Sequence, residues 1–352
     1  MKLDEFLAAV RVLIGQARVE RLPEDGKVVF LSDLHLGDRS RRDDFRRSET
    51  LVAEALEKFY LPDNWRLVLN GDVEELQKFD LPVVRAAYRG LFDLFARFRD
   101  GPGLCKLVGN HDHALLAASD DEFPIGHALR LETAAGPILA FHGHQSNKFY
   151  GKYNAFAQFV VRRIASPLAI PNVGTRMQSE RRWRAERRIY RAARELGVVV
   201  IAGHTHRPLF ESHSKYDTLR WKLESLLRRY TETDGSERDE LEALIRVYRD
   251  ELRGLSGREL RRPVSRSLYE KEDLLVPAMF NSGSATGREG FTAVEIEGPT
   301  IALVHWCREG SARAYLEREA VEAATLAGTP WRRQVLARDT LEYVFARLRL
   351  LA

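Results

Sequence analysis

The feature that most constrains the fold of this sequence is a short apolar run that ends abruptly in polar residues. Five such runs, rich in Val, Ile, Leu or Phe, cover residues 27–35, 65–72, 104–112, 137–144 and 198–206. Continuous hydrophobicity of this kind is typical of a strand buried on both faces, as when helices pack on both sides of a sheet. Helical stripes in residues 49–60 and 82–98 separate some of the runs. Strands that alternate with helices predict an α/β fold.

The second half of the sequence has a different pattern. Strand candidates in residues 279–284, 291–298 and 300–306 follow one another with glycine or proline between them and no helix, which predicts an antiparallel meander. Together with the alternating part, they predict a mixed sheet, or a sandwich of two sheets, with helices outside. We expect a single domain that spans residues 1–352.

Three helical segments lie outside this strand pattern. Residues from about 147 to 197 predict a helical lid insertion, and residues from about 212 to 273 predict a helical hairpin that turns at Asp234 and Gly235. Residues from about 330 to 352 predict a C-terminal helix.

The composition indicates the environment of the protein. The two cysteines, Cys105 and Cys307, lie in apolar runs, which predicts buried thiols in a reducing compartment. Residues 1–20 lack the features of a signal peptide and predict an amphipathic helix, and no apolar run approaches the roughly 18 residues of a membrane span. We therefore expect a cytoplasmic protein. Its 55 basic and 51 acidic side chains are too evenly balanced to indicate a nucleic-acid binder, and no oligomeric state is predicted.

Each of the five runs ends in potential metal ligands. Seven of the ten histidines lie in four of these runs or directly after one of them, namely His35, His111, His113, His142, His144, His204 and His206. A single histidine or aspartate after a strand is usually a structural or turn residue, but five strand ends with the same chemistry point to a common site. Ligand sites of open α/β sheets lie beyond the carboxyl ends of the strands, where these residues are expected to meet.

The types of ligand indicate the kind of metal. Carboxylates, a carboxamide oxygen and imidazoles without thiolate suit Mn²⁺, Fe, Zn²⁺, Co²⁺ or Ni²⁺. The candidate ligands are Asp33, His35, Asp72, Asn110, His142, His204 and His206. Seven ligands exceed what one ion needs, so we expect two divalent ions, with the Asp72 carboxylate able to bridge them.

The ordered motifs resemble those of the calcineurin-like metallophosphoesterases. They are D-x-H at Asp33, G-D at Gly71, G-N-H-D at Gly109, a strand-end histidine at His142 and G-H-x-H at Gly203. The resemblance runs from about residue 27 to residue 210 and continues through residues 281–283. It implies a four-layered αββα metallophosphoesterase sandwich with helical insertions.

The resemblance also implies a role for each motif residue. One metal would be held by Asp33, His35 and His206, and the other by Asn110, His142 and His204, with Asp72 bridging. His111 would lie near the substrate and stabilise the transition state or assist the leaving oxygen, and Asp112 would orient it. The second motif reads GDVEE instead of carrying the Asp or Arg often found a few residues on, so Glu74 and Glu75 receive no catalytic role.

The expected activity is that of a dinuclear metal-dependent phosphoesterase. Two cations about 3.5–4 Å apart lower the pKa of a bridging water, and the resulting hydroxide attacks the phosphorus of a phosphomonoester, phosphodiester or pyrophosphate. Mn²⁺ is the metal that we expect first. A nuclease or a cyclic-nucleotide phosphodiesterase would use the same site.

Two further functions remain open. The DLHLGD start, the HGH of the fourth motif and the helical insertion after it also resemble the UDP-2,3-diacylglucosamine pyrophosphatase group, whose inserted helices cap a lipid-binding cleft. A metal-free scaffold is the remaining alternative, and the complete set of ligands argues against it.

Three residues are candidates for contact with the phosphorylated substrate, namely Arg39, Arg207 and Asn147. An arginine near a strand end can hold a phosphate through two hydrogen bonds, although each one fits a solvated face equally well. The basic stretch 181–194, with Trp183 and Tyr190 interleaved, predicts a helix that binds an anionic membrane surface or a nucleic acid. A solvent-exposed lid helix is the equally weighted alternative. Membrane binding would make the cytoplasmic protein a peripheral one.

Overall fold

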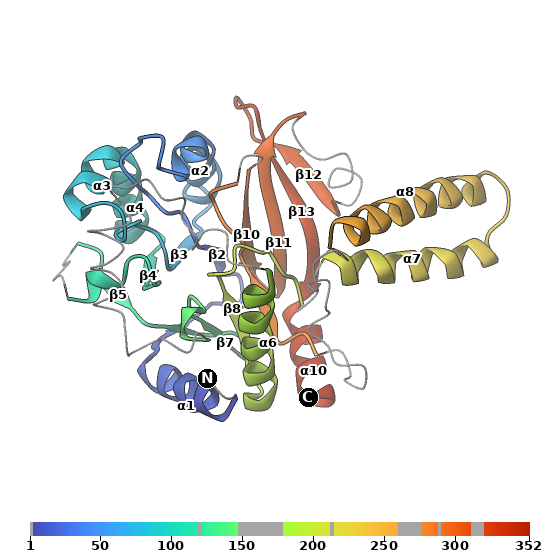
Figure 1. The fold of residues 1–352 in the computed structure, drawn as a ribbon, viewed down its shortest axis with the longest axis horizontal. Coiled ribbons are helices and arrows are strands. Elements are labelled where there is room, and N and C mark those ends of the chain that lie inside the picture. Colours follow the sequence, from blue (N-terminus) through green and yellow to red (C-terminus); the bar gives the residue numbers. More distant parts are fainter. Residues whose placement is uncertain are drawn as a thin grey trace.

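Two β-sheets organise the computed structural model, which describes residues 3–117, 122–146, 179–211, 215–259, 276–287, 290–310 and 320–352 (Figure 1). The strands of the larger sheet lie in the order β12 (Glu322–Thr325), β13 (Trp331–Thr340), β11 (Thr300–Arg308), β10 (Phe291–Glu297), β2 (Lys27–Leu31), β3 (Arg66–Asn70), β4 (Leu104–Leu107) and β5 (Ile125–Gly126). Those of the smaller sheet lie in the order β1 (Arg18–Arg21), β6 (Leu129–Glu132), β7 (Pro137–Ala140), β8 (Val199–Ala202) and β9 (Met279–Asn281). The described residues therefore form a mixed α/β fold.

All five apolar runs contain strands, as predicted. β2, β3 and β4 are parallel neighbours in the larger sheet, and β7 and β8 are parallel neighbours in the smaller one. Parallel neighbours end at the same edge of a sheet, so the polar residues that follow β2, β3 and β4 lie together, as do those that follow β7 and β8. The candidate ligands thus come from the edges of two sheets.

Both faces of β2 are buried, but by different neighbours. Val28 and Phe30 belong to a hydrophobic cluster that includes the strands of the smaller sheet, whereas Val29 and Leu31 belong to a second cluster. The second cluster draws on helices α2 (Glu49–Ala55), η2 (Leu56–Tyr60), α3 (Leu81–Ala87) and α4 (Arg89–Asp100). The continuous hydrophobicity of the run therefore reflects a sheet on one side and helices on the other, instead of helices on both sides.

Three helices share the hydrophobic cluster of the smaller sheet, namely α1 (Leu3–Gln16), α6 (Ser179–Leu196) and α10 (Leu341–Leu351). α1 is amphipathic, as predicted, and buries Phe6, Leu7, Val10 and Leu13. Each fully buried side chain of this size contributes roughly 1.5–3 kcal/mol, so these faces fix the helices on the body. α6 belongs to the predicted lid insertion, of which residues 147–178 lie outside the described residues.

The predicted meander over residues 279–306 is wrong for its first strand. β9 pairs with β8 in parallel in the smaller sheet, while β10 and β11 form an antiparallel hairpin in the larger sheet. β9 has only three residues and all are buried, so its sequence has no alternation that would reveal its partner. The hairpin turns at Gly298, where a φ of 53° favours glycine.

The predicted C-terminal helix over residues 330–352 is wrong for its first half. β13 occupies Trp331–Thr340 and pairs antiparallel with β11, and α10 begins only at Leu341. Thr340 caps this helix, because its hydroxyl accepts from the N–H of Tyr343 at 3.2 Å. Val335 and Leu341 fit one helical stripe, but they pack in different hydrophobic clusters. Pairing with β11 therefore overrides the apparent helical period.

A helical pair fills most of the predicted hairpin segment, residues 212–273. Helices α7 (Lys215–Glu232) and α8 (Ser236–Glu259) project side by side from the two sheets (Figure 1). The turn between them contains Asp234 and Gly235, and Gly235 has a left-handed φ of 71°. The pair has a small core of its own, formed by Leu219, Leu226, Leu241 and Tyr248.

Cys105 and Cys307 are buried thiols, as predicted, and form no disulfide within the described residues. Burial raises the pKa of the Cys105 thiol to about 12, so this thiol stays protonated. None of the described helices is long and apolar enough to cross a membrane.

Candidate metal centre

The loops that follow four strands, β2, β3, β7 and β8, bring six of the seven candidate ligands into two groups. One group is Asp33, His35 and His206, and the other is Asp72, His142 and His204. Within each group, one ligand atom of every residue lies within 4.8 Å of the others. Each group joins residues from loops that are far apart in the sequence, so the fold brings these loops together.

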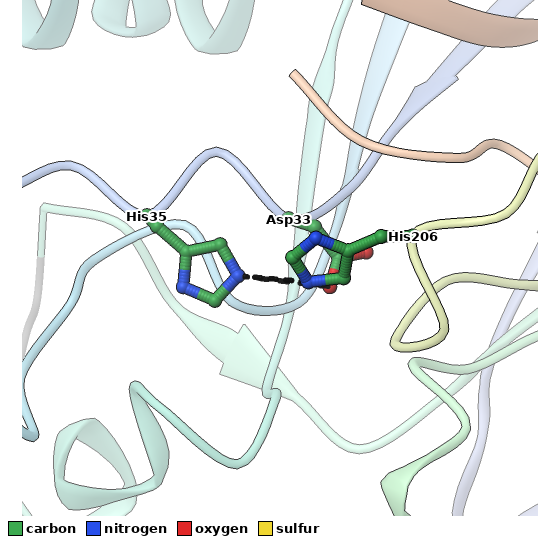
Figure 2. A group of neighbouring side chains, drawn as sticks. All are labelled: Asp33, His35 and His206. Carbon is green, nitrogen blue, oxygen red and sulfur yellow. Dashed lines mark hydrogen bonds and ion pairs between the residues drawn. The ribbon is translucent and has the colours of Figure 1, made fainter. Parts of the chain in front are cut away.

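In the first group, two imidazoles and a carboxylate converge (Figure 2). The Nε2 atoms of His35 and His206 lie 3.2 Å apart. Oδ1 of Asp33 is 3.1 Å from Nε2 of His206 and 3.8 Å from Nε2 of His35. Three donor atoms of these types facing one another suit a divalent cation.

In the second group, Nε2 of His142 faces Oδ2 of Asp72 at 3.1 Å. Nδ1 of the same ring lies 2.8 Å from the carbonyl oxygen of Asn70, to which it donates its hydrogen. This tautomer leaves a lone pair on Nε2, so two acceptors face each other and a cation between them would relieve the repulsion. Burial disfavours a charged His142, but the Asp72 and Asp33 carboxylates outweigh it and raise the pKa of His142 to about 9. A proton therefore takes this place when no metal is bound.

The Asp72 carboxylate lies between the two groups. Besides its contact with His142, Oδ2 of Asp72 is 3.9 Å from Nε2 of His35, and Nε2 of His142 is 4.0 Å from Oδ1 of Asp33. Burial opposes ionisation of both carboxyls, but electrostatic interaction with the neighbouring histidines, chiefly His206 for Asp33 and His142 for Asp72, lowers the pKa of both well below the ordinary value. Both side chains are therefore anionic and attract cations.

A buried acceptor atom adds to the case for a metal. Oδ1 of Asn110 has no hydrogen-bond partner in the described part of the chain. A buried acceptor without a partner costs about 1–3 kcal/mol, and a bound cation would remove that cost. The loop that carries Asn110 is held at the centre, because the N–H of His111 donates to Oδ1 of Asp72 at 2.8 Å. The residues present therefore fit a metal.

Five of the seven candidate ligands have a left-handed backbone. The φ angles are 55° at Asp33, 54° at His35, 53° at Asp72, 68° at His204 and 56° at His206. Each such conformation of a residue other than glycine costs on the order of 1–3 kcal/mol and persists only where the surroundings impose it. Strain of this kind gathers at functional sites, which supports the assignment of the site independently of the side-chain chemistry.

Glu75 is a residue of the site to which the sequence analysis gave no role. Its Oε2 lies 3.1 Å from Nδ1 of His35, and its Oε1 lies 2.7 Å from Nδ1 of His111. Burial opposes ionisation of Glu75, but the charge of His111 and the hydrogen bonds from both rings lower its pKa well below the ordinary value. One carboxylate thus orients a candidate ligand and the candidate catalytic imidazole together.

Asp112 has a different task from the one expected. Its Oδ2 accepts from the N–H of Val73 at 2.7 Å, and its Oδ1 accepts from the N–H of Gly109 at 2.6 Å. Asp112 thereby ties the loop after β3 to the loop after β4, and Glu75 takes the expected place beside the His111 ring. Burial and the charges of Asp72 and Glu74 raise the pKa of Asp112 to about 7.

The candidate substrate residues make contacts within the protein. The Arg39 guanidinium pairs with Glu49 and lies 5.0 Å from the centre of the Tyr88 ring. The Arg207 guanidinium pairs with the buried Glu186 of α6. Asn147 lies outside the described residues.

Gly109 lies so close to Asp72 that a larger residue at this position should destabilise the protein. A Cβ atom at this position would lie 2.0 Å from Oδ1 of Asp72 and 2.3 Å from its backbone nitrogen. We expect Gly109→Ala to lower the free energy of unfolding of the metal-free protein by about 1–3 kcal/mol, because the loop after β3 must shift. Urea denaturation measures this change.

Gly90→Ala is the matched control, because a Cβ atom there meets nothing within 4 Å and the residue lies in α4. This control should raise the free energy of unfolding by up to about 1 kcal/mol. Equal stability of the two variants would show that the loop at Gly109 is not packed as described.

The comparisons with known proteins do not identify a family. No family model matches the sequence, and no curated protein matches it either. Among solved structures, the chain is similar to Vacuolar Protein Sorting 29 from Cryptosporidium parvum, with 11% identity and a TM-score of 0.33 over 82% of this chain and 93% of that chain. A likeness at this level carries no argument about function, so the functional inference depends on the site.

Proposed function

We propose that this protein is a metal-dependent phosphoric ester hydrolase of the calcineurin-like metallophosphoesterase type. The observation that carries the proposal is the pair of adjoining ligand groups that meet at Asp72. The ordered strand-end motifs and the strained backbone at the ligands support the same conclusion. The two hydrophobic clusters, one between the sheets and one beneath α2 to α4, support the finer assignment to a four-layered αββα sandwich.

The residues divide naturally into two metal sites. Asp33, His35 and His206 would hold one ion, and Asn110, His142 and His204 would hold the other, with Asp72 shared between them. Bound divalent ions, with Mn²⁺ as our first choice and Fe, Zn²⁺, Co²⁺ or Ni²⁺ as alternatives, would supply Lewis-acid stabilisation of the phosphoryl oxygens and an activated water.

The protein's own contribution to the chemistry centres on His111. Glu75 accepts the hydrogen of Nδ1, so the ring is fixed with Nε2 3.9 Å from Oδ2 of Asp72 and available to a substrate oxygen. A proton on Nε2 can then be donated to the leaving oxygen as the ester bond breaks. The His111 side chain is nearly buried, so water competes little for this hydrogen bond.

The substrate that we propose is a phosphomonoester, a phosphodiester or a pyrophosphate. Binding of an anionic membrane surface or a nucleic acid by the basic residues 181–194 stays a prediction. α6 contains the basic stretch 181–194, and its residues Ile189, Tyr190, Ala192 and Ala193 pack in the hydrophobic core. Only its other side remains for an anionic membrane surface or a nucleic acid.

One preparation tests the proposed function. Metal content is measured together with hydrolysis of p-nitrophenyl phosphate, its bis-ester, a UDP-sugar diphosphate and cyclic nucleotides, with Mn²⁺, Zn²⁺ and Ni²⁺ compared. We expect bound metal and metal-dependent hydrolysis of at least one ester, with a rate enhancement that chelation removes. The preferred ester separates a phosphomonoesterase from a phosphodiesterase and from a pyrophosphatase. Protein that binds no metal at any concentration tested would overturn the proposal and favour a scaffold.

A further inference from the structure

We propose that α6 is a clamp that positions the two histidine-bearing loops of the smaller sheet, with Glu186 as its main positioning residue. The inference rests on the proposed metal centre, because its consequence is a change in metal affinity. The two loops follow β7 and β8 and carry His142 in one and His204 and His206 in the other.

Glu186 holds the loop after β8 through Arg207. The Glu186 side chain is completely buried. Nε of Arg207 donates to Oε1 of Glu186 at 3.1 Å, and Nη2 of Arg207 donates to Oε2, so the pair is bidentate. Arg207 directly follows His206, whose left-handed φ of 56° requires support from its surroundings. Fixing the guanidinium fixes the backbone at the ligand.

Arg188 and Ile189 hold the loop after β7. Nη1 of Arg188 donates to the carbonyl oxygen of Ser146 at 2.7 Å, at the end of the short helix η4 (His144–Ser146). Cδ1 of Ile189 would lie 3.3 Å from a Cβ atom at Gly143, the residue that follows His142. α6 therefore contacts both loops within two turns of the same helix.

The buried ion pair of Glu186 and Arg207 is better suited to fixing the position of the loop than to stabilising the fold. Apolar residues of similar volume often stabilise a fold as well as a buried ion pair does, whereas a bidentate pair fixes direction and distance. Groups that orient metal ligands from behind typically change metal affinity by about 10–100-fold when they are replaced. Glu186 acts on the ligands through Arg207 and the backbone, so its removal should loosen the loop without removing a ligand.

The test compares Glu186→Gln with Glu195→Gln, an exposed glutamate on the same helix. Co²⁺ is titrated into the metal-free full-length proteins and followed by its visible absorption, and thermal unfolding of the same samples checks the fold. We expect Co²⁺ affinity to fall by about 10–100-fold in Glu186→Gln and to stay within about twofold in Glu195→Gln. Arg207→Gln should weaken binding similarly, and the double variant Glu186→Gln with Arg207→Gln should bind no more weakly than either single variant.

The outcomes separate this inference from the proposed function. A wild-type protein that binds no Co²⁺ overturns the metal centre itself. A folded Glu186→Gln protein with wild-type affinity overturns the clamp alone, and so do losses in the two single variants that simply add in the double variant. If Glu186→Gln does not fold, Arg188→Gln decides, because this change removes the bond to Ser146 and leaves the pair of Glu186 and Arg207 in place. We expect about tenfold weaker binding, and unchanged binding overturns the clamp.

Discussion

Asp72→Asn is expected to remove bound metal and hydrolytic activity together. The substitution keeps the shape of the side chain but removes the negative charge that lies between the two ligand groups. Because a neutral amide then replaces the charged carboxylate beside His35 and His142, both ligand groups attract a divalent cation less strongly, and two cations are no longer held side by side. We expect activity to fall by roughly 10²–10³-fold or more. Metal content and turnover with the preferred ester are measured on the same sample.

Asp93→Asn is the matched control for this variant, because Asp93 is exposed on α4. It should bind metal and turn over substrate as the wild type does. Full activity of Asp72→Asn with unchanged metal content would remove Asp72 from its bridging place and with it the division of the ligands into two sites.

His111→Ala is expected to keep its metal but lose turnover. The ring of His111 belongs to no ligand pair in our assignment, and Glu75 holds it so that Nε2 remains for a substrate oxygen. Loss of a positioned general acid or transition-state donor typically costs 10²–10⁴-fold in rate, so kcat should fall by about that factor while metal content is unchanged. Glu75→Gln should lower kcat in the same direction by a smaller factor, because the ring is then less firmly oriented.

His127→Ala serves as the control for loss of an imidazole away from the ligand groups, because His127 is half-buried near β5 and β6. Its metal content and turnover should match those of the wild type. If His111→Ala instead loses its metal, His111 is a ligand and the catalytic group must be sought elsewhere in the site.

The apolar strands, and the residues that gather at their ends, could be predicted from the sequence because each is a local signal. A run such as residues 27–35 is a buried strand followed by a loop, and the structure brings Asp33 and His35 of this loop close to His206. The division of the five runs between two sheets could not be predicted, because β2 and β7 show the same continuous hydrophobicity whichever neighbours bury them.

The sequence could not predict that Glu75 is the hydrogen-bond partner of His111, for a different reason. Asp112 adjoins His111 in the chain, yet its carboxylate is taken up by two backbone N–H groups, and Glu75 from the previous loop reaches the ring. Glu74 and Glu75 are neighbours of the same type, and only the fold shows that Glu74 pairs with Lys106 whereas Glu75 faces the imidazoles. Direction of a side chain in a strand-end loop is a tertiary property, which the residue order leaves undetermined.

The left-handed backbone at Asp33, His35, Asp72, His204 and His206 has a consequence for how such a protein evolves. Glycine would fit each of these positions with less strain, by roughly 1–2 kcal/mol per residue. A mutational drift that rewarded stability alone would therefore erode the ligands first and leave a more robust, inactive protein. Five costly residues within one site indicate that these positions meet a requirement other than stability, and in a homologue that binds no metal we expect glycine, asparagine or a relaxed backbone at the same five places.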